Sequence, residues 1–233
     1  YAPSDVPADG PYQSAALAQD AAAMIEALGY PRAAVFGHDW GAVAAYGAAI
    51  LAPQRVARLV TAAVPHGPAL ATAFLTSYAQ QRRSWYMFFF QTPLADMAVA
   101  HDDFAFLEHL WTDWSPGWRW PAEEMAALKD TFRQPGVLAA ALGYYRHTFN
   151  PLLQRPELAE AQGRTQLEPV TVPTLFFHGA RDGCIGPELA DGMDALFPAG
   201  LETVIVPDAG HFVHQERPDV VNAKLLEFLA PLR

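Results

Sequence analysis

The sequence predicts an α/β fold, in which a mostly parallel sheet is flanked by helices and interrupted by a helical insertion. Short apolar stretches alternate with helix-like stretches near both ends of the 233-residue chain, as is typical of parallel sheets with crossover helices. The central region has few β-branched runs and many aromatic residues, which indicates helices. We therefore expect a core of residues 1–66 and 169–233 and a helical cap of residues 67–168.

The first part of the core should hold a helix and a strand–helix–strand unit. Apolar residues at helical spacing follow Ser14, so we expect a helix that Ser14 caps and Gly29 ends. Residues 33–36 and 58–64 are apolar strands, and residues 41–51 form a helix of small residues. Because one short helix joins the two strands, they should be parallel.

The alternation resumes after the cap. Residues 173–177 and 202–206 are predicted strands, and residues 188–197 and 217–229 are predicted helices. The strands should join the same parallel sheet, whose carboxyl ends carry functional sites.

Three proline-containing segments should break the cap into separate helices. These segments are TPLAD, SPGWRWP and RQPG. We expect most of the cap's aromatic side chains to pack in its core.

Composition and charge exclude several classes of function. The net charge of −10 argues against nucleic acid and anionic membranes as partners. No apolar run reaches the roughly 18 residues that a membrane-spanning helix needs. The single cysteine, Cys184, leaves no disulfide framework and fits a reducing, cytoplasmic location. The expected partner is a small-molecule substrate, and the sequence allows a homodimer.

A carboxylate between two glycines marks the first candidate site. Asp39 stands between Gly37 and Gly41 in GHDWG, which fits the G-x-nucleophile-x-G turn from strand to helix, with aspartate where serine often stands. The glycines would relieve crowding around a strained nucleophile, and the next helix N-terminus favours negative charge. The alternative is an ordinary helix-capping aspartate.

Two later loops hold groups that could complete this site. Asp182 and His211 each come just after a predicted strand. Alone each is a weak signal, because Asp182 could be a turn residue and His211 has Asp208 and His214 close by. Together with Asp39 they place nucleophile, acid and histidine in a specific chain order after parallel strands.

The sequence resembles the α/β-hydrolases with an aspartate nucleophile, the group that holds epoxide hydrolases and haloalkane dehalogenases. The resemblance covers nearly the whole chain and implies the α/β-hydrolase fold with a cap. It implies that Asp39 is the nucleophile, Asp182 the acid and His211 the base. The segments that carry it, besides the cap, are YAPSDVP, GHDWGA, HGARDG and GHFVHQERP.

An aspartate nucleophile also has a chemical reason that is independent of the family. A serine that attacks a saturated carbon would form an ether, which water does not readily release. A carboxylate forms an ester, whose carbonyl carbon water can attack. Asp39 therefore indicates an alkyl electrophile, either an epoxide or a carbon–halogen bond.

The cap favours the epoxide. Opening an epoxide makes an alkoxide, and a tyrosine can donate a hydrogen bond to it. YMFFFQTPLAD resembles the epoxide-hydrolase cap segment in which a tyrosine precedes a glutamine by five residues, here Tyr86 and Gln91. YYR resembles the second cap site, which assigns Tyr145, with Tyr144 as the alternative. These features predict a hydrolase that opens an apolar epoxide to a vicinal diol.

Three further aromatic residues are expected around the substrate. Trp40 would supply its backbone N–H to the oxyanion hole and its ring to the substrate pocket, together with Trp85 and Phe89. The Trp85 indole could instead bind halide, so a haloalkane dehalogenase with the same triad is the alternative. No dinucleotide fingerprint, phosphate loop or metal-ligand spacing is found, so neither a cofactor nor a metal is implied.

One part of the family pattern is not found in these residues. The His-Gly-x-Pro segment, whose backbone supplies the other half of the oxyanion hole, should lie upstream. A sheet that begins at residues 33–36 would also expose an apolar edge. We therefore expect the natural chain to carry about 60–80 further residues before Tyr1. An inactive fragment and a non-catalytic ligand-binding scaffold are the alternatives of another class.

Overall fold

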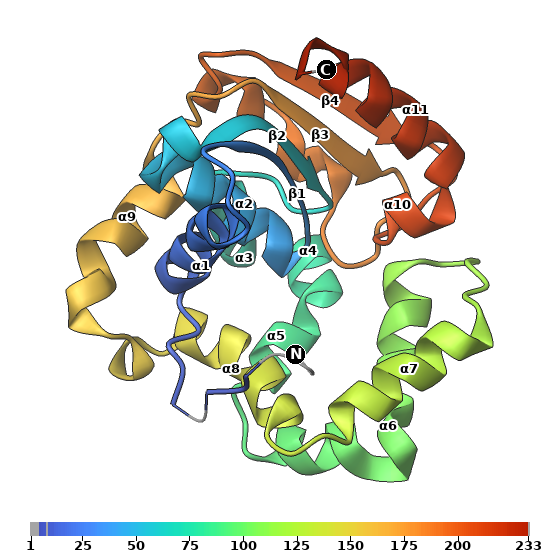
Figure 1. Ribbon diagram of the computed structural model, residues 1–233. Coiled ribbons are helices and arrows are strands. Elements are labelled where there is room, and N and C mark those ends of the chain that lie inside the picture. Colours follow the sequence, from blue (N-terminus) through green and yellow to red (C-terminus); the bar gives the residue numbers. More distant parts are fainter. Residues whose placement is uncertain (1–4, 8, 233) are drawn as a thin grey trace.

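One parallel sheet lies between helices, and a group of helices lies against the carboxyl ends of its strands (Figure 1). The computed structural model describes residues 5–7 and 9–232, so residues 1–4 of YAPSDVP lie outside the described residues. The described strands pair in the order β1-β2-β3-β4, and every pair is parallel. The strands are β1 (Ala33–His38), β2 (Val56–Ala62), β3 (Thr174–Gly179) and β4 (Leu201–Val206).

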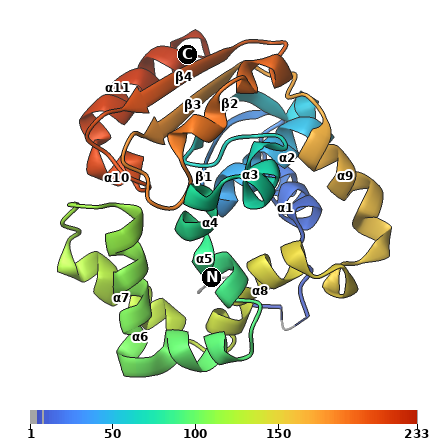
Figure 2. The same ribbon diagram turned by 180° about the vertical axis from the view of Figure 1, so that it is seen from behind.

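Helices cover both faces of this sheet (Figures 1 and 2). Helix α2 (Trp40–Leu51) packs on β1 and β2, and α1 (Ser14–Ala27) and α9 (Ala159–Leu167) pack on α2. On the other face, α10 (Val213–Glu216) and α11 (Pro218–Leu229) pack on β3. This is the layered architecture expected for strands joined by crossover helices.

The central strands are apolar because both of their faces are buried. Leu59 and Phe176 belong to the larger apolar cluster, together with α2 and the cap. Val60 and Phe177 point to the opposite face, into the cluster that contains Val221 of α11. Strand β1 lies at the edge of the described sheet, where Phe36 is 42% exposed.

The region between β2 and β3 is helical. Three of its breaks fall at the predicted proline-containing segments, and others fall elsewhere, as at Ser77 and Ser84. The division of the chain into core and cap at residues 66 and 169 stays a prediction. Besides α9, the α-helices of this region are α3 (Ala69–Thr76), α4 (Tyr78–Arg83), α5 (Trp85–Phe89), α6 (Leu94–Trp114), α7 (Ala122–Phe132) and α8 (Val137–Phe149).

Two local predictions are wrong, and one break in the cap was not predicted. Residues 188–197 form two short 3-10 turns rather than a helix, because Gly192 between them has φ 75°. Ser14 is the first helical residue rather than the cap, and its hydroxyl meets that of Thr165, 3.2 Å away. Helix α6 is broken at 101–104, where Asp102, Asp103 and Phe104 have positive φ. Aspartate enters this left-handed region more readily than most residues do.

The helices give no sign of a membrane span. Within the described part of the chain, none combines the length and the apolar character that crossing a bilayer demands.

Candidate active site

The turn between β1 and α2 presents Asp39 at the carboxyl end of the sheet. Asp39 has φ 53° and ψ −122°, a conformation that is strained for any residue but glycine and that its surroundings must hold. Its N–H donates to the Ala62 carbonyl at the end of β2, 3.3 Å away. The Asp39 side chain is 26% exposed, so a small molecule can reach it.

The two glycines beside Asp39 have different roles. A Cβ on Gly37 would lie 2.1 Å from the carbonyl oxygen of Gly41, so only glycine lets α2 start this close to β1. A Cβ on Gly41 would meet no described atom within 4 Å. The prediction that both glycines relieve crowding therefore holds for Gly37 and is wrong for Gly41.

His211 joins Asp39 to Asp182. Its Nε2 lies 3.2 Å from Oδ2 of Asp39, and its Nδ1 donates to Oδ2 of Asp182 at 2.9 Å. The three residues come from the loops after β1, β3 and β4, and His211 and Asp182 are buried. A nucleophile, a base and an orienting acid in this sequence of contacts form the arrangement that activates an attacking group.

The Asp182 carboxylate is satisfied on both oxygens. Oδ1 accepts the backbone N–H groups of Cys184 and Ile185, at 2.7 and 2.9 Å. Oδ2 faces Nδ1 of His211 and also Nε2 of the buried His178, 3.3 Å away. Because each bond favours the ionised form, the acid is fixed as an anion.

The charged groups of the site shift one another's pKa values. Burial raises the pKa of Asp182, but the adjacent His211 and His178 outweigh it and hold the pKa far below its usual value. Partial burial likewise opposes the ionisation of Asp39, yet hydrogen bonding to His211 lowers the Asp39 pKa overall, and the backbone N–H of Trp40 adds to this. For His211, burial lowers the pKa, but Cys184 and the two carboxylates raise it well above its usual value. These pKa directions favour a protonated His211 between two ionised carboxylates.

Backbone contacts hold the His211 loop between core and cap. The N–H of His211 donates to the carbonyl of Trp114, at the end of α6, 3.1 Å away. The same carbonyl accepts the N–H of Gly183 at 3.0 Å. Burial, followed by the charge of His211, lowers the pKa of His38 to about 3, so its neutral ring can donate from Nε2 to the His211 carbonyl, 2.9 Å away.

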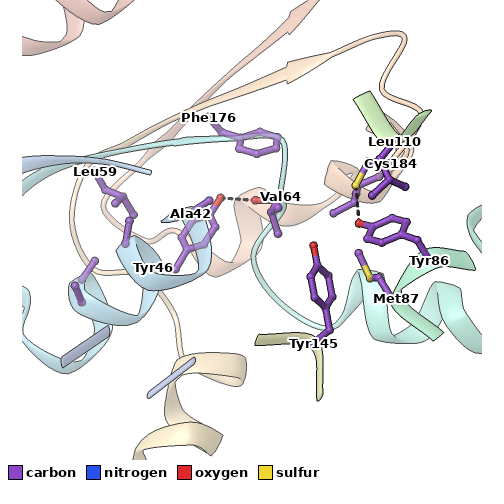
Figure 3. Packing of buried hydrophobic residues seen from close by; sticks show 14 of the residues in the cluster. Ala42, Tyr46, Leu59, Val64, Tyr86, Met87, Leu110, Tyr145, Phe176 and Cys184 are labelled. Carbon is purple, nitrogen blue, oxygen red and sulfur yellow. Dashed lines mark hydrogen bonds between the residues drawn. The ribbon is translucent and has the colours of Figure 1, made fainter. Parts of the chain in front are cut away.

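The two predicted tyrosines lie side by side, their rings 5.8 Å apart. A hydrogen bond of 3.1 Å joins the hydroxyl of the buried Tyr86 to the sulfur of Cys184, and Figure 3 shows this contact beside Tyr145. Burial, with Cys184, Tyr145 and Asp39 close by, raises the pKa of Tyr86 well above its usual value. The Tyr86 phenol therefore keeps its proton and can donate it.

A small apolar cavity opens on Asp39. Its volume is about 90 Å³. Tyr145 lines it from the cap, and the Trp40 ring, 5.3 Å from that of Tyr145, lines it from the core. The other lining residues are Val43, Val64, Leu70, Phe74, Met87, Thr148, Phe149 and Ile185.

Two predicted substrate-binding residues lie elsewhere. Trp85 is 44% exposed and lines a separate surface pocket of about 590 Å³ with Arg82 and Arg83. Phe89 contacts the Trp85 ring and stacks on Phe106. Neither Trp85 nor Phe89 is among the described residues that line the cavity on Asp39.

The fold and the site geometry agree with the comparison to known families. A sequence model described as alpha/beta hydrolase fold matches residues 1–218. The chain belongs to the α/β-hydrolase fold family.

This α/β-hydrolase is similar to proteins named as epoxide hydrolases. Human Epoxide hydrolase 4 is 30% identical over 94% of this chain, and mouse Epoxide hydrolase 4 is 29% identical over 98% of it. The chain spans 59% of the human protein and 63% of the mouse protein. The crystal structure of Bacillus megaterium epoxide hydrolase in complex with an inhibitor matches with a TM-score of 0.79 and 28% identity, over 94% of this chain and 76% of that one.

Sequence reasoning missed several residues of the candidate site. Cys184 reaches the site although its only sequence signal was its place in the loop after Asp182. The Trp114 carbonyl has no sequence signal, because any residue type could supply it. Among the nearby alternatives, Asp208 pairs with Arg181 at the surface, 3.3 Å away.

The glycine contacts predict unequal effects of two matched substitutions. Gly37→Ala should lower the free energy of unfolding by about 3 kcal/mol, because a Cβ against a backbone carbonyl forces the elbow apart. Gly41→Ala should change it by less than about 1 kcal/mol, because the site is open and alanine favours helices. Urea denaturation of both variants measures the difference. Equal losses would contradict the proposed packing of the elbow.

Proposed function

We propose that this protein opens an apolar epoxide to a vicinal diol through an ester on Asp39. The observation that carries the proposal is a carboxylate in the nucleophile position, within hydrogen-bond reach of His211 and at the edge of an apolar cavity. The similarity to proteins named epoxide hydrolases supports the same reaction.

In the first step, Oδ of Asp39 attacks an epoxide carbon. A C–O bond to the carboxylate forms while the C–O bond of the strained ring breaks, and the ring oxygen takes up the electron pair. Tyr86 and Tyr145 are proposed to donate to that oxygen. Their position beside each other and the raised pKa of Tyr86 support this role, since a neutral phenol is a good donor to an alkoxide.

Alkylation of Asp39 prepares His211 for the second step. The ester removes one of the negative charges that raise the His211 pKa, so the imidazolium loses its proton more easily. That proton replaces the one that the tyrosines gave to the substrate oxygen. Neutral His211, oriented by Asp182, can then take a proton from water, and the resulting hydroxide attacks the ester carbonyl.

The hydrolysis of the ester passes through an oxyanion. The Trp40 backbone N–H already contributes to stabilising the Asp39 carboxylate, so we propose that it also donates to the developing oxyanion. Collapse of this intermediate breaks the bond between the carbonyl carbon and the oxygen that carries the alkyl group, and that oxygen takes up the remaining proton of the attacking water. The diol leaves, and Asp39 is regenerated.

The alternative enzyme is a haloalkane dehalogenase with the same triad. A halide needs N–H donors, which makes indole groups informative. Trp85 lies away from the cavity, whereas the two tyrosines lie at the site, which favours the epoxide. A non-catalytic ligand-binding scaffold is disfavoured by the strained Asp39, because strain of this kind persists where a function needs it.

Replacing the base should trap the ester. In full-length His211→Gln protein incubated with styrene oxide, ester hydrolysis should slow by about 10²–10⁴-fold, so the alkyl adduct should accumulate on the peptide that contains Asp39. Peptide mass spectrometry measures it. An Asp39→Asn variant is the matched control and should carry no adduct there. An active parent whose His211→Gln variant never forms the adduct would rule out the ester, and halide release from bromoalkanes without diol formation would favour the dehalogenase.

The tyrosine assignment predicts different effects of neighbouring residues. Tyr86→Phe and Tyr145→Phe should each lower kcat for styrene oxide by about 10–100-fold, because one donor to the ring oxygen is lost. Tyr144→Phe is the matched control and should change kcat less than about twofold, because Tyr144 contacts Tyr12 and the Trp40 ring instead. A large loss in Tyr144→Phe with none in Tyr145→Phe would reverse the assignment.

A further inference from the structure

We propose that Asp39, Cys184 and His211 together bind a thiophilic divalent cation such as Zn²⁺. One carboxylate oxygen, the thiol sulfur and one imidazole nitrogen lie within 4.8 Å of one another. The binding itself rests on these contacts alone. That the ion inhibits the enzyme rests on the proposed function, because the ion would occupy both the nucleophile and the base.

The donor set suits zinc better than the common hard cations. Zinc binds cysteine sulfur, histidine nitrogen and carboxylate oxygen, with bonds of about 2.0–2.3 Å, so its ligand atoms lie about 3.5 Å apart. The Asp39 and His211 atoms are already 3.2 Å apart. Magnesium and calcium prefer oxygen ligands only, so a thiolate selects against them.

The same buried carboxylate orients two of the three ligands. Asp182 accepts the Nδ1–H of His211 through one oxygen and the backbone N–H of Cys184 through the other. A carboxylate behind the second nitrogen of a metal-binding histidine is the usual way in which its ring is oriented. Asp39 is held by the β1–α2 turn. The three donors are therefore prearranged.

The neighbouring groups can accommodate the bound ion. Binding replaces the S–H bond of Cys184 with a metal–sulfur bond and the Nε2–H bond of His211 with a metal–nitrogen bond, and both released protons pass to solvent. The Tyr86 hydroxyl, 3.1 Å from the sulfur, can donate a hydrogen bond to the thiolate. Asp39 also lines the apolar cavity, from which water can reach the ion and complete a tetrahedral shell.

Cobalt titration of the full-length protein tests the site without an activity assay. Cys184 is the only cysteine of these 233 residues, so a thiolate-to-cobalt charge-transfer band in the near ultraviolet that Cys184→Ser abolishes comes from this residue. We expect one Co²⁺ per chain with this band, and competition by Zn²⁺. Asp39→Asn should weaken Co²⁺ binding although it is catalytically inert, so the result does not depend on the proposed reaction.

Inhibition by zinc provides the second readout. Loss of an outer-shell partner of a metal site already weakens binding about 10–100-fold. We therefore expect Cys184→Ser and Cys184→Ala to raise the Zn²⁺ concentration for half-inhibition at least about 100-fold, each relative to its own metal-free rate. His109→Gln removes an exposed histidine and should leave inhibition unchanged.

Two results would overturn the proposal. One is the absence of the thiolate band in the parent protein at saturating Co²⁺. The other is Zn²⁺ binding to folded Cys184→Ser as tight as to the parent, measured by calorimetry with folding verified by circular dichroism. A parent that binds Co²⁺ with the band but hydrolyses no epoxide would contradict the proposed function and leave the metal site standing.

Discussion

The buried carboxylate of Asp182 is the group on which the rest of the site depends. One oxygen holds the ring of His211, and the other holds the backbone of the loop that carries Cys184 and Ile185. A buried anion with unmet hydrogen bonds would be costly, whereas one bonded on both oxygens stays ionised and rigid. Asp182 therefore fixes the orientation of the His211 ring toward Asp39 and the position of the loop that carries the Cys184 thiol.

The cap contributes to the same arrangement through its backbone as well as its side chains. The carbonyl of Trp114 accepts hydrogen bonds from both the His211 loop and the Gly183 loop, while Tyr145 lines the cavity on Asp39 and Tyr86 lies beside Tyr145. When Asp39 attacks an epoxide carbon from the core side, the epoxide oxygen would therefore find its proton donors on the cap side. Both regions contribute to the proposed chemistry. The core carries the proposed nucleophile, acid and base, and the cap carries the two phenols.

The central strands β2 and β3 could be predicted from the sequence because burial on both faces demands largely apolar runs. Helix breaks at proline segments were predictable for a similarly local reason. The two 3-10 turns around Gly192 and the left-handed turn at Asp102 and Asp103 were not, because neighbouring structure decides them.

For the site as well, residues with a local sequence signal could be predicted and residues without one could not. Asp39, Asp182 and His211 were found as candidates because each follows a strand, and parallel strands bring their carboxyl ends together. Contacts between side chains far apart in sequence carry no such signal. Tyr86 and Cys184 are 98 residues apart, and Asp39, Cys184 and His211, which we propose bind a cation, come from three separate loops. Trp85 and Phe89 were predicted to bind substrate but lie away from the cavity, because aromatic character alone did not indicate which cap rings face it.

The most direct test of the central claim is the origin of the oxygen in the first diol formed. A single turnover of styrene oxide by excess full-length protein in H₂¹⁸O would be followed by mass spectrometry of the diol and of the peptide that contains Asp39. Because water attacks the ester carbonyl, the first diol should be unlabelled and ¹⁸O should appear in the Asp39 carboxylate. Label in the first diol and none in the peptide would show that water attacks the epoxide directly and would contradict the account.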